Sequence, residues 1–137
     1  MIRDQKLWTW HILAGAVILV LLGLHMLTMH MEGVVKLEGL NPASAANEAQ
    51  GGGKLQPIDW ANVKARSAKV FYLVTYILLL GAALFHGLYG ATNVVHEANP
   101  PRWLHKTVSA LAVVVGLGLF AFGTWAAIAA FLLAKAL

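Results

Sequence analysis

The stretch VFYLVTYILLLGAALFHGLYGATNVV, residues 70–95, contains no charged side chain and is long enough to cross a lipid bilayer as one helix. A hydrocarbon core of about 30 Å requires about 20 apolar residues at a rise of about 1.5 Å per residue. Two further stretches meet this requirement, and the three predict helices over about residues 7–30, 68–96 and 102–134. The sequence therefore predicts an all-α membrane protein with three transmembrane helices.

The composition agrees with a membrane protein, because 59% of the 137 residues are hydrophobic and only 12% are charged. A soluble domain carries about 25% charged residues. The formal net charge is +4, but basic residues of a membrane protein usually flank its spans, so we expect binding to a lipid bilayer and not to nucleic acid. The chain has no cysteine, which excludes a thiolate-held iron–sulfur cluster and covalent c-type haem in this polypeptide.

The segments between the spans predict a single membrane-anchor domain over residues 1–137, with one long external loop. Residues 31–67 are polar, include the run Gly51-Gly52-Gly53, and have too few large apolar side chains to build a core of their own. The turn at Asn99-Pro100-Pro101 cannot continue a helix. We therefore expect the second and third spans to be antiparallel neighbours.

The third span is rich in small residues, which favour close contact between helices in lipid. We expect it to pack closely against another helix of this chain or of a partner. The small residues are Ala110, Ala112, Gly116, Gly118, Ala121, Gly123, Ala126 and Ala130.

Histidine is the chemical signal of this sequence, because a histidine inside hydrocarbon is costly and each one is a functional hypothesis. His25 and His86 lie within the predicted spans. The other four fall at or near span ends, where headgroups or water can bind them. These four are His11, His30, His96 and His105.

His86 has unusually small neighbours on its side of the helix. At 100° per residue, Ala82 and Gly90 lie about 40° to either side of it, and Ala83 lies about 60° away. This leaves a flat recess beside an imidazole, which a porphyrin ring requires, and histidine is the usual axial ligand of b-type haem. We therefore predict that His86 binds haem iron and that Gly90 belongs to the cofactor-binding surface. A histidine hydrogen-bonded between helices is the alternative.

The two histidines within the spans lie at different depths. His25 is about 27 Å from the start of its span, whereas His86 is about 15 Å from the same side of the membrane. Two axial nitrogens on one iron lie only about 4 Å apart, so these residues cannot bind the same haem. Either His25 is structural, or two haems are present and each is completed by another chain. The run from His25 to Met31 also contains imidazole and thioether groups that suit copper, although His25 and His30 are about 140° apart on a helix.

The segment Phe85-His86-Gly87-Leu88-Tyr89-Gly90, with Glu97 eleven positions after the histidine, resembles the haem-bearing helix in membrane anchors of succinate dehydrogenase and fumarate reductase. Together with Gly23-Leu24-His25-Met26 and the run LHKTVSA at 104–110, it is similar to the last three helices of the five-helix di-haem cytochrome b of menaquinone-linked enzymes. Asn93 stands where the di-haem family often has arginine, and Ala98 where single-haem anchors usually have tyrosine.

The resemblance implies a haem b-binding membrane-anchor subunit of a succinate:quinone or quinol:fumarate oxidoreductase, an enzyme complex of the tricarboxylic acid cycle. Such a subunit passes electrons between a quinone, here expected to be menaquinone, and an iron–sulfur subunit. The resemblance implies one or two haems, with His86 and His25 as axial ligands, one per haem. The partners that it implies are a second membrane-anchor subunit, an iron–sulfur subunit and a flavoprotein subunit. Further candidates for contacts with the quinone or with haem propionates are His11, Glu97, Trp103 and His105.

By the same resemblance, the amino terminus and the turn near Pro100 face the cytoplasm. Because the first span begins near Met1 without a presequence rich in arginine and serine, we expect a bacterial or archaeal cytoplasmic membrane. Two other functions remain open. One is a cytochrome b subunit of a hydrogenase or formate dehydrogenase, which usually has four or more helices. The other is a haem-free structural anchor or transporter subunit, in which histidines serve helix contacts or a proton relay.

Overall fold

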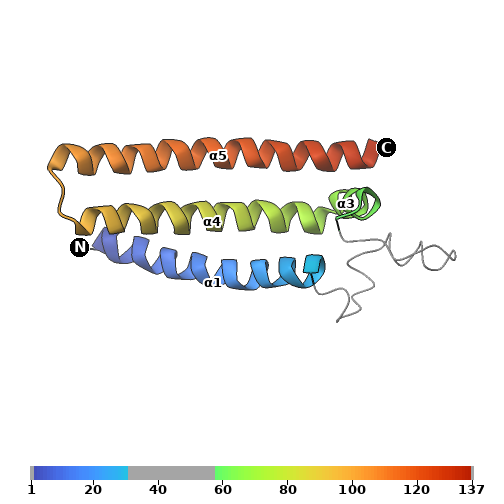
Figure 1. Ribbon diagram of the computed structural model, residues 1–137, viewed down its shortest axis with the longest axis horizontal. Helices are drawn as coiled ribbons and strands as arrows, with labels where there is room; N and C mark the ends of the chain where they lie inside the picture. The colour runs from blue at the N-terminus through green and yellow to red at the C-terminus, as the bar shows by residue number, and fades with distance from the viewer. Residues whose placement is uncertain (1, 31–57, 137) are drawn as a thin grey trace.

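The computed structural model describes residues 2–30 and 58–136 (Figure 1). They form three long helices, α1 (Ile2–His30), α4 (Val70–Glu97) and α5 (Arg102–Ala136), and one short helix, α3 (Trp60–Ser67). The predicted all-α architecture with three long apolar helices is confirmed. The observed bounds extend the first helix by five residues at its start and the third by two residues at its end.

The three long helices are each long and apolar enough to cross a membrane, over Gln5–Thr28, Val70–Glu97 and Arg102–Ala136. Large apolar side chains on these helices point away from the rest of the chain. Leu19 of α1 is 76% exposed, and Val114 of α5 is 68% exposed. Surfaces of this kind are stable against lipid tails or another membrane chain, so the protein is a multi-pass membrane protein.

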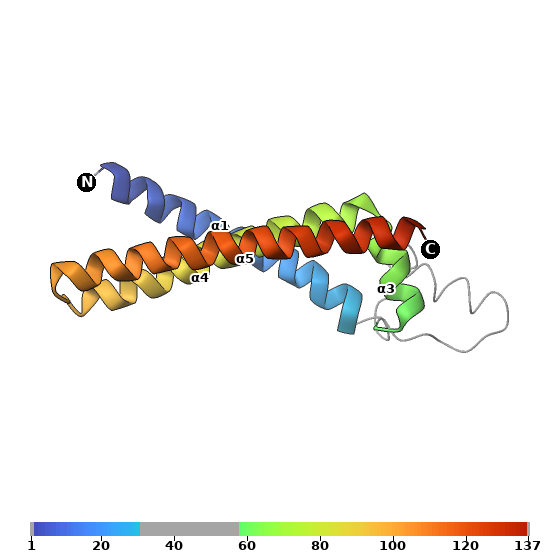
Figure 2. The same cartoon turned by 90° about the horizontal axis from the view of Figure 1, so that it is seen from above.

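Helix α4 lies between the other two long helices and contacts both (Figure 1). Helix α5 runs antiparallel beside it, as predicted, whereas α1 crosses it obliquely (Figure 2). Within the described residues, α1 makes no contact with α5. Asn99 turns the chain from α4 to α5 with a φ of 49°, a left-handed conformation that asparagine adopts more readily than most residues.

Two glycines of α5 allow close packing against α4. A Cβ atom added at Gly116 would lie 2.8 Å from Leu88, and one added at Gly123 would lie 2.5 Å from Leu80. These are the close contacts that small residues in this span lead us to expect. Gly118 would meet no atom within 4 Å, so it lies on a face that this chain leaves open.

Part of the predicted loop over residues 31–67 is helical instead. Residues 60–67 form α3, which contacts α4 and α5; residues 31–57, including the glycine run, lie outside the described residues. The buried side chains of α3 are polar, since Asn62 is 0% and Arg66 2% exposed, while Trp60 is 66% exposed. In most short helices the buried side chains are apolar and the exposed ones are polar, which is the reverse of this arrangement. A search of the sequence for an apolar buried face therefore does not find α3. An exposed tryptophan suits the membrane interface.

Candidate cofactor site

His86 of α4 is half-buried, and its ring is oriented by the backbone of α1. Its Nδ1 lies 3.0 Å from the carbonyl oxygen of His11. Because a carbonyl only accepts hydrogen bonds, Nδ1 carries the proton and donates it. In neutral imidazole the other nitrogen, Nε2, then keeps its lone pair, and no described residue is hydrogen-bonded to it. His86 is therefore held in the tautomer whose Nε2 keeps its lone pair.

The imidazole of His11 stacks on that of His86, with ring centroids 4.1 Å apart and planes within 6° of parallel. Each ring also lies over a glycine of the opposite helix. A Cβ added at Gly15 would be 3.0 Å from His86 Cε1, and one added at Gly90 would be 3.2 Å from His11 Cε1. The close crossing of α1 and α4 therefore depends on two histidines and two glycines.

This crossing changes the surroundings predicted for His86. The space over Gly90 is taken by the ring of His11 and does not form an open recess. Ala83 is exposed, and Ala82 lines an open groove next to His86. A flat group that binds beside His86 therefore has less space than the sequence predicts, because α1 covers part of this side of α4.

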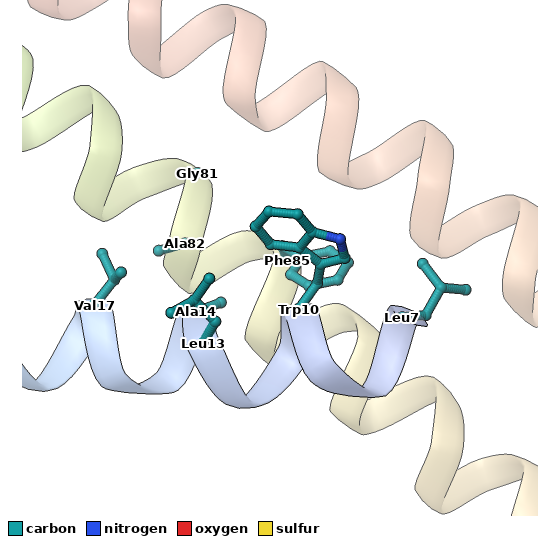
Figure 3. A pocket seen from close by; sticks show the side chains of 8 residues that line it. All are labelled: Leu7, Trp10, Leu13, Ala14, Val17, Gly81, Ala82 and Phe85. Atoms are coloured by element: carbon teal, nitrogen blue, oxygen red, sulfur yellow. The ribbon is translucent and has the colours of Figure 1, made fainter. Parts of the chain in front are cut away.

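The groove beside this crossing is wholly formed by apolar residues of α1 and α4 (Figure 3). It is a wide-open hollow with a volume of about 400 Å³. Phe85 and Ala82, one and four positions before His86, place the groove next to that residue along α4. The lining residues are Leu7, Trp10, Leu13, Ala14, Val17, Gly81, Ala82 and Phe85.

His25 lies at a different level of the molecule. Its ring contacts Tyr76 edge-on, with centroids 6.1 Å apart and planes at 74°, and it lines a small hollow of about 40 Å³. Tyr76 and His86 are ten positions apart on α4, or about 15 Å. The difference in depth expected from the sequence is thus present, and one iron cannot bind both histidines. Of the residues invoked for copper, the side chains of Met29 and His30 and all of Met31 lie outside the described residues.

The remaining candidates gather at the turn between α4 and α5. His96 and His105 have ring centroids 3.9 Å apart and planes at 36°, and both are half-buried. Glu97 and Trp103 are exposed beside them. His11, also predicted as a contact for quinone or propionate, lies away from this turn, where its ring stacks on that of His86. In the described part of the chain, no three His, Asp or Glu side chains are grouped to hold a metal ion.

The pairing of His11 with His86 was missed from the sequence, although a signal exists. Both helices carry histidine followed four positions later by glycine, at His11–Gly15 and at His86–Gly90. On antiparallel helices, that shared spacing places each ring over the glycine of the other helix.

Comparisons of the chain with protein-family models, with curated proteins and with solved structures found no match. Its function must therefore be argued from its own residues.

Proposed function

We propose that this chain is a haem b-binding membrane-anchor subunit of a succinate:quinone or quinol:fumarate oxidoreductase. The observation that carries the proposal is the hydrogen bond from His86 Nδ1 to the carbonyl of His11, 3.0 Å long, within a candidate membrane span. Histidines that bind metals almost always donate their other ring N–H to a carbonyl or carboxylate in this way. The bond leaves Nε2 of His86 available as an axial ligand.

The described residues fit one axial ligand at each of two levels. His86 supplies an imidazole at the α1–α4 crossing, and His25 of α1 supplies another at the level of Tyr76, which is about 15 Å from His86 along α4. His11 cannot be the opposite ligand of His86 here, because their rings stack in contact with no space for an iron between them. A haem held by His86 and a second histidine would therefore take that second histidine from a partner membrane-anchor subunit. The bound haem supplies one-electron transfer.

In this proposal, other residues of the chain orient the imidazole of His86 and shield it from water. The carbonyl of His11 fixes the plane and tautomer of His86, and the apolar groove that includes Ala82 and Phe85 offers a water-poor surface beside it.

Since the chain lacks cysteine, iron–sulfur clusters belong to an iron–sulfur subunit and dicarboxylate chemistry to a flavoprotein. The proposal includes menaquinone as the quinone, a bacterial or archaeal cytoplasmic membrane, and a cytoplasmic amino terminus. Glu97, Trp103 and His105 at the α4–α5 turn stay candidates for contacts with quinone or propionates.

One observation favours a second function, a haem-free structural anchor. The rings of His11 and His86 contact each other, and the hydrogen bond of His86 already joins two helices. Interhelical hydrogen bonds and close approach at glycine stabilise membrane helix pairs without any cofactor. In that case the histidines are packing residues, and the apolar groove holds lipid.

Haem and flavin assays on the intact complex separate the two functions. The tagged chain is purified in mild detergent with its partners, and haem is measured from the pyridine haemochrome spectrum. We expect about two haems per flavin in the native complex, and loss of about half in His86→Ala. His96→Ala, a histidine change outside the crossing, is the matched control and should keep the haem content.

If His86→Ala fails to assemble, His86→Met provides a second measurement, because methionine is also an axial haem ligand. We expect it to retain haem with a shifted spectrum and a raised reduction potential. Unchanged haem content and spectra in both variants would refute the ligand assignment. A native complex without Soret absorbance would favour the haem-free anchor.

A further inference from the structure

The α4–α5 turn brings together three donor side chains that the proposed haem ligation does not use. His96 is in the last turn of α4, His105 is in the first turn of α5, and Ser109 follows His105 by four positions on the same face. The ring centroids of the two histidines are 3.9 Å apart. Ser109 Oγ lies 3.5 Å from His96 Nε2. Three donors from two helices therefore face one small volume.

The geometry inside this cluster is loose for hydrogen bonds. A separation of 3.5 Å between nitrogen and oxygen is at the long limit of a hydrogen bond, whose usual length is about 2.9 Å. The two rings are tilted at 36° and share no hydrogen bond among the described residues, unlike the nearly parallel rings of His11 and His86. The long contact with Ser109 is thus the one hydrogen bond that either ring makes among the described residues.

The spacing matches the requirements of a transition-metal cation. Two imidazole nitrogens that bind one metal at about 2.0–2.1 Å each lie no more than about 4 Å apart. The ring centroids of His96 and His105 are 3.9 Å apart, close enough for one cation to bind a nitrogen of each ring once the side chains turn toward it. Imidazole suits Zn²⁺ and Cu²⁺, and Cu²⁺ binds such ligands most strongly among the divalent first-row ions.

We propose that His96, His105 and Ser109 form a binding site for a divalent transition-metal cation where α4 meets α5. The two imidazoles supply nitrogen ligands, and the hydroxyl of Ser109 supplies an oxygen ligand directly or through a water molecule. The site is half-buried at the end of the helix pair, so a cation can enter from the aqueous side. A bound cation would join the two helices at their turn.

The charged side chains near the cluster do not attract a cation on balance. Glu97 is exposed next to His96, while Arg102 and Lys106 are exposed on the first turn of α5. The formal sum of one acidic and two basic groups repels a cation, so affinity must come from the nitrogen ligands. Binding should therefore be selective for Cu²⁺ and Zn²⁺ over Mg²⁺ and Ca²⁺, which prefer oxygen ligands.

The test is a Cu²⁺ titration of the full-length protein, purified in detergent with its natural partners through an affinity tag that contains no histidine. Electron paramagnetic resonance reports how many imidazole nitrogens bind the copper. We expect a copper signal with two nitrogen ligands, which Zn²⁺ displaces and Mg²⁺ does not. His96→Phe and His105→Phe keep an aromatic ring in place and remove the nitrogens, so each should weaken binding by about tenfold or more.

Ser109→Ala should weaken copper binding by a smaller factor, and Thr107→Ala is its matched hydroxyl control. Thr107 is exposed, and its hydroxyl donates to the carbonyl of Trp103, so its removal should leave the affinity unchanged. Circular dichroism verifies that each variant is folded. Equal copper affinity in the native protein and in both phenylalanine variants would overturn the proposal. So would a copper signal with fewer than two nitrogen ligands.

Discussion

The two histidine pairs of this protein have nearly equal ring separations and very different surroundings. At the α1–α4 crossing, the rings of His11 and His86 are within 6° of parallel, and each covers a glycine. At the α4–α5 turn, the rings of His96 and His105 are tilted at 36° and lie beside a serine hydroxyl. The crossing pair packs two helices that are far apart in sequence. The turn pair lies where the chain itself already holds the helices together.

The difference indicates that contact between two histidines does not by itself identify a ligand site. In the crossing pair, backbone groups decide what the rings do: a carbonyl fixes one nitrogen of His86, and two glycines set how closely the rings approach. In the turn pair the one hydrogen bond among the described residues is the long contact of 3.5 Å between Ser109 Oγ and His96 Nε2, and no backbone carbonyl or glycine holds the rings. Substitutions at both pairs test this contrast.

The largest expected effect comes from filling the space under a ring at the crossing. Gly15→Leu should lower the free energy of unfolding by about 1–3 kcal/mol, because a Cβ at this position already lies 3.0 Å from His86 Cε1. Unfolding in increasing sodium dodecyl sulfate, followed by circular dichroism, measures the change. Gly23→Leu is the matched control on the same helix, since a Cβ there meets nothing within 4 Å. Equal effects of the two substitutions would contradict the role of the crossing.

An intermediate effect should separate the two residues of the crossing pair. His86→Phe loses the hydrogen bond to the carbonyl of His11 and should destabilise the protein by about 0.6–1 kcal/mol. His11→Phe keeps that carbonyl and removes an Nδ1 that is buried without a hydrogen-bond partner. Its stability should be unchanged or slightly higher. The same detergent unfolding assay applies, and a larger loss in His11→Phe than in His86→Phe would disprove this asymmetry.

The smallest expected effect on stability is at the turn. His105→Phe should change the free energy of unfolding by no more than about 0.5 kcal/mol, because the ring is half-buried and retains an aromatic contact. The same variant should lose most of its copper affinity. A large loss of copper affinity with little loss of stability would distinguish the turn pair from the crossing pair. A loss of stability as large as that of Gly15→Leu would make the two pairs equivalent as packing contacts.

The sequence predicted the features that depend on local pattern. Apolar length is sufficient to place three spans, and Asn99-Pro100-Pro101 is sufficient to make the last two antiparallel neighbours. Which residue a glycine contacts depends on the face of the helix that packs against its neighbour, and the sequence does not specify that face. Gly116 and Gly118 therefore look alike in the sequence, although of these two only Gly116 meets α4.

The candidate site was predicted less completely for the same reason. The sequence separated His25 from His86 in depth, because rise per residue is a local property. It did not place His11 on His86, because that contact depends on how α1 crosses α4. It also missed α3, where the buried residues Asn62 and Arg66 are polar.

Helix α5 also sets the position of both histidine pairs relative to the bilayer. Lys106 and Lys135 are 29 residues apart, or about 44 Å, close to the full bilayer thickness of about 40–45 Å. Lys135 Nζ lies 4.6 Å from the centre of the Phe131 ring, as expected for an amine at the polar boundary. An upright α5 then leaves His105 at one headgroup layer and His86 about 15 Å deeper than His96. In that arrangement the turn pair lies among hydrated headgroups and the crossing pair in a less polar medium, where electrostatic interactions are stronger.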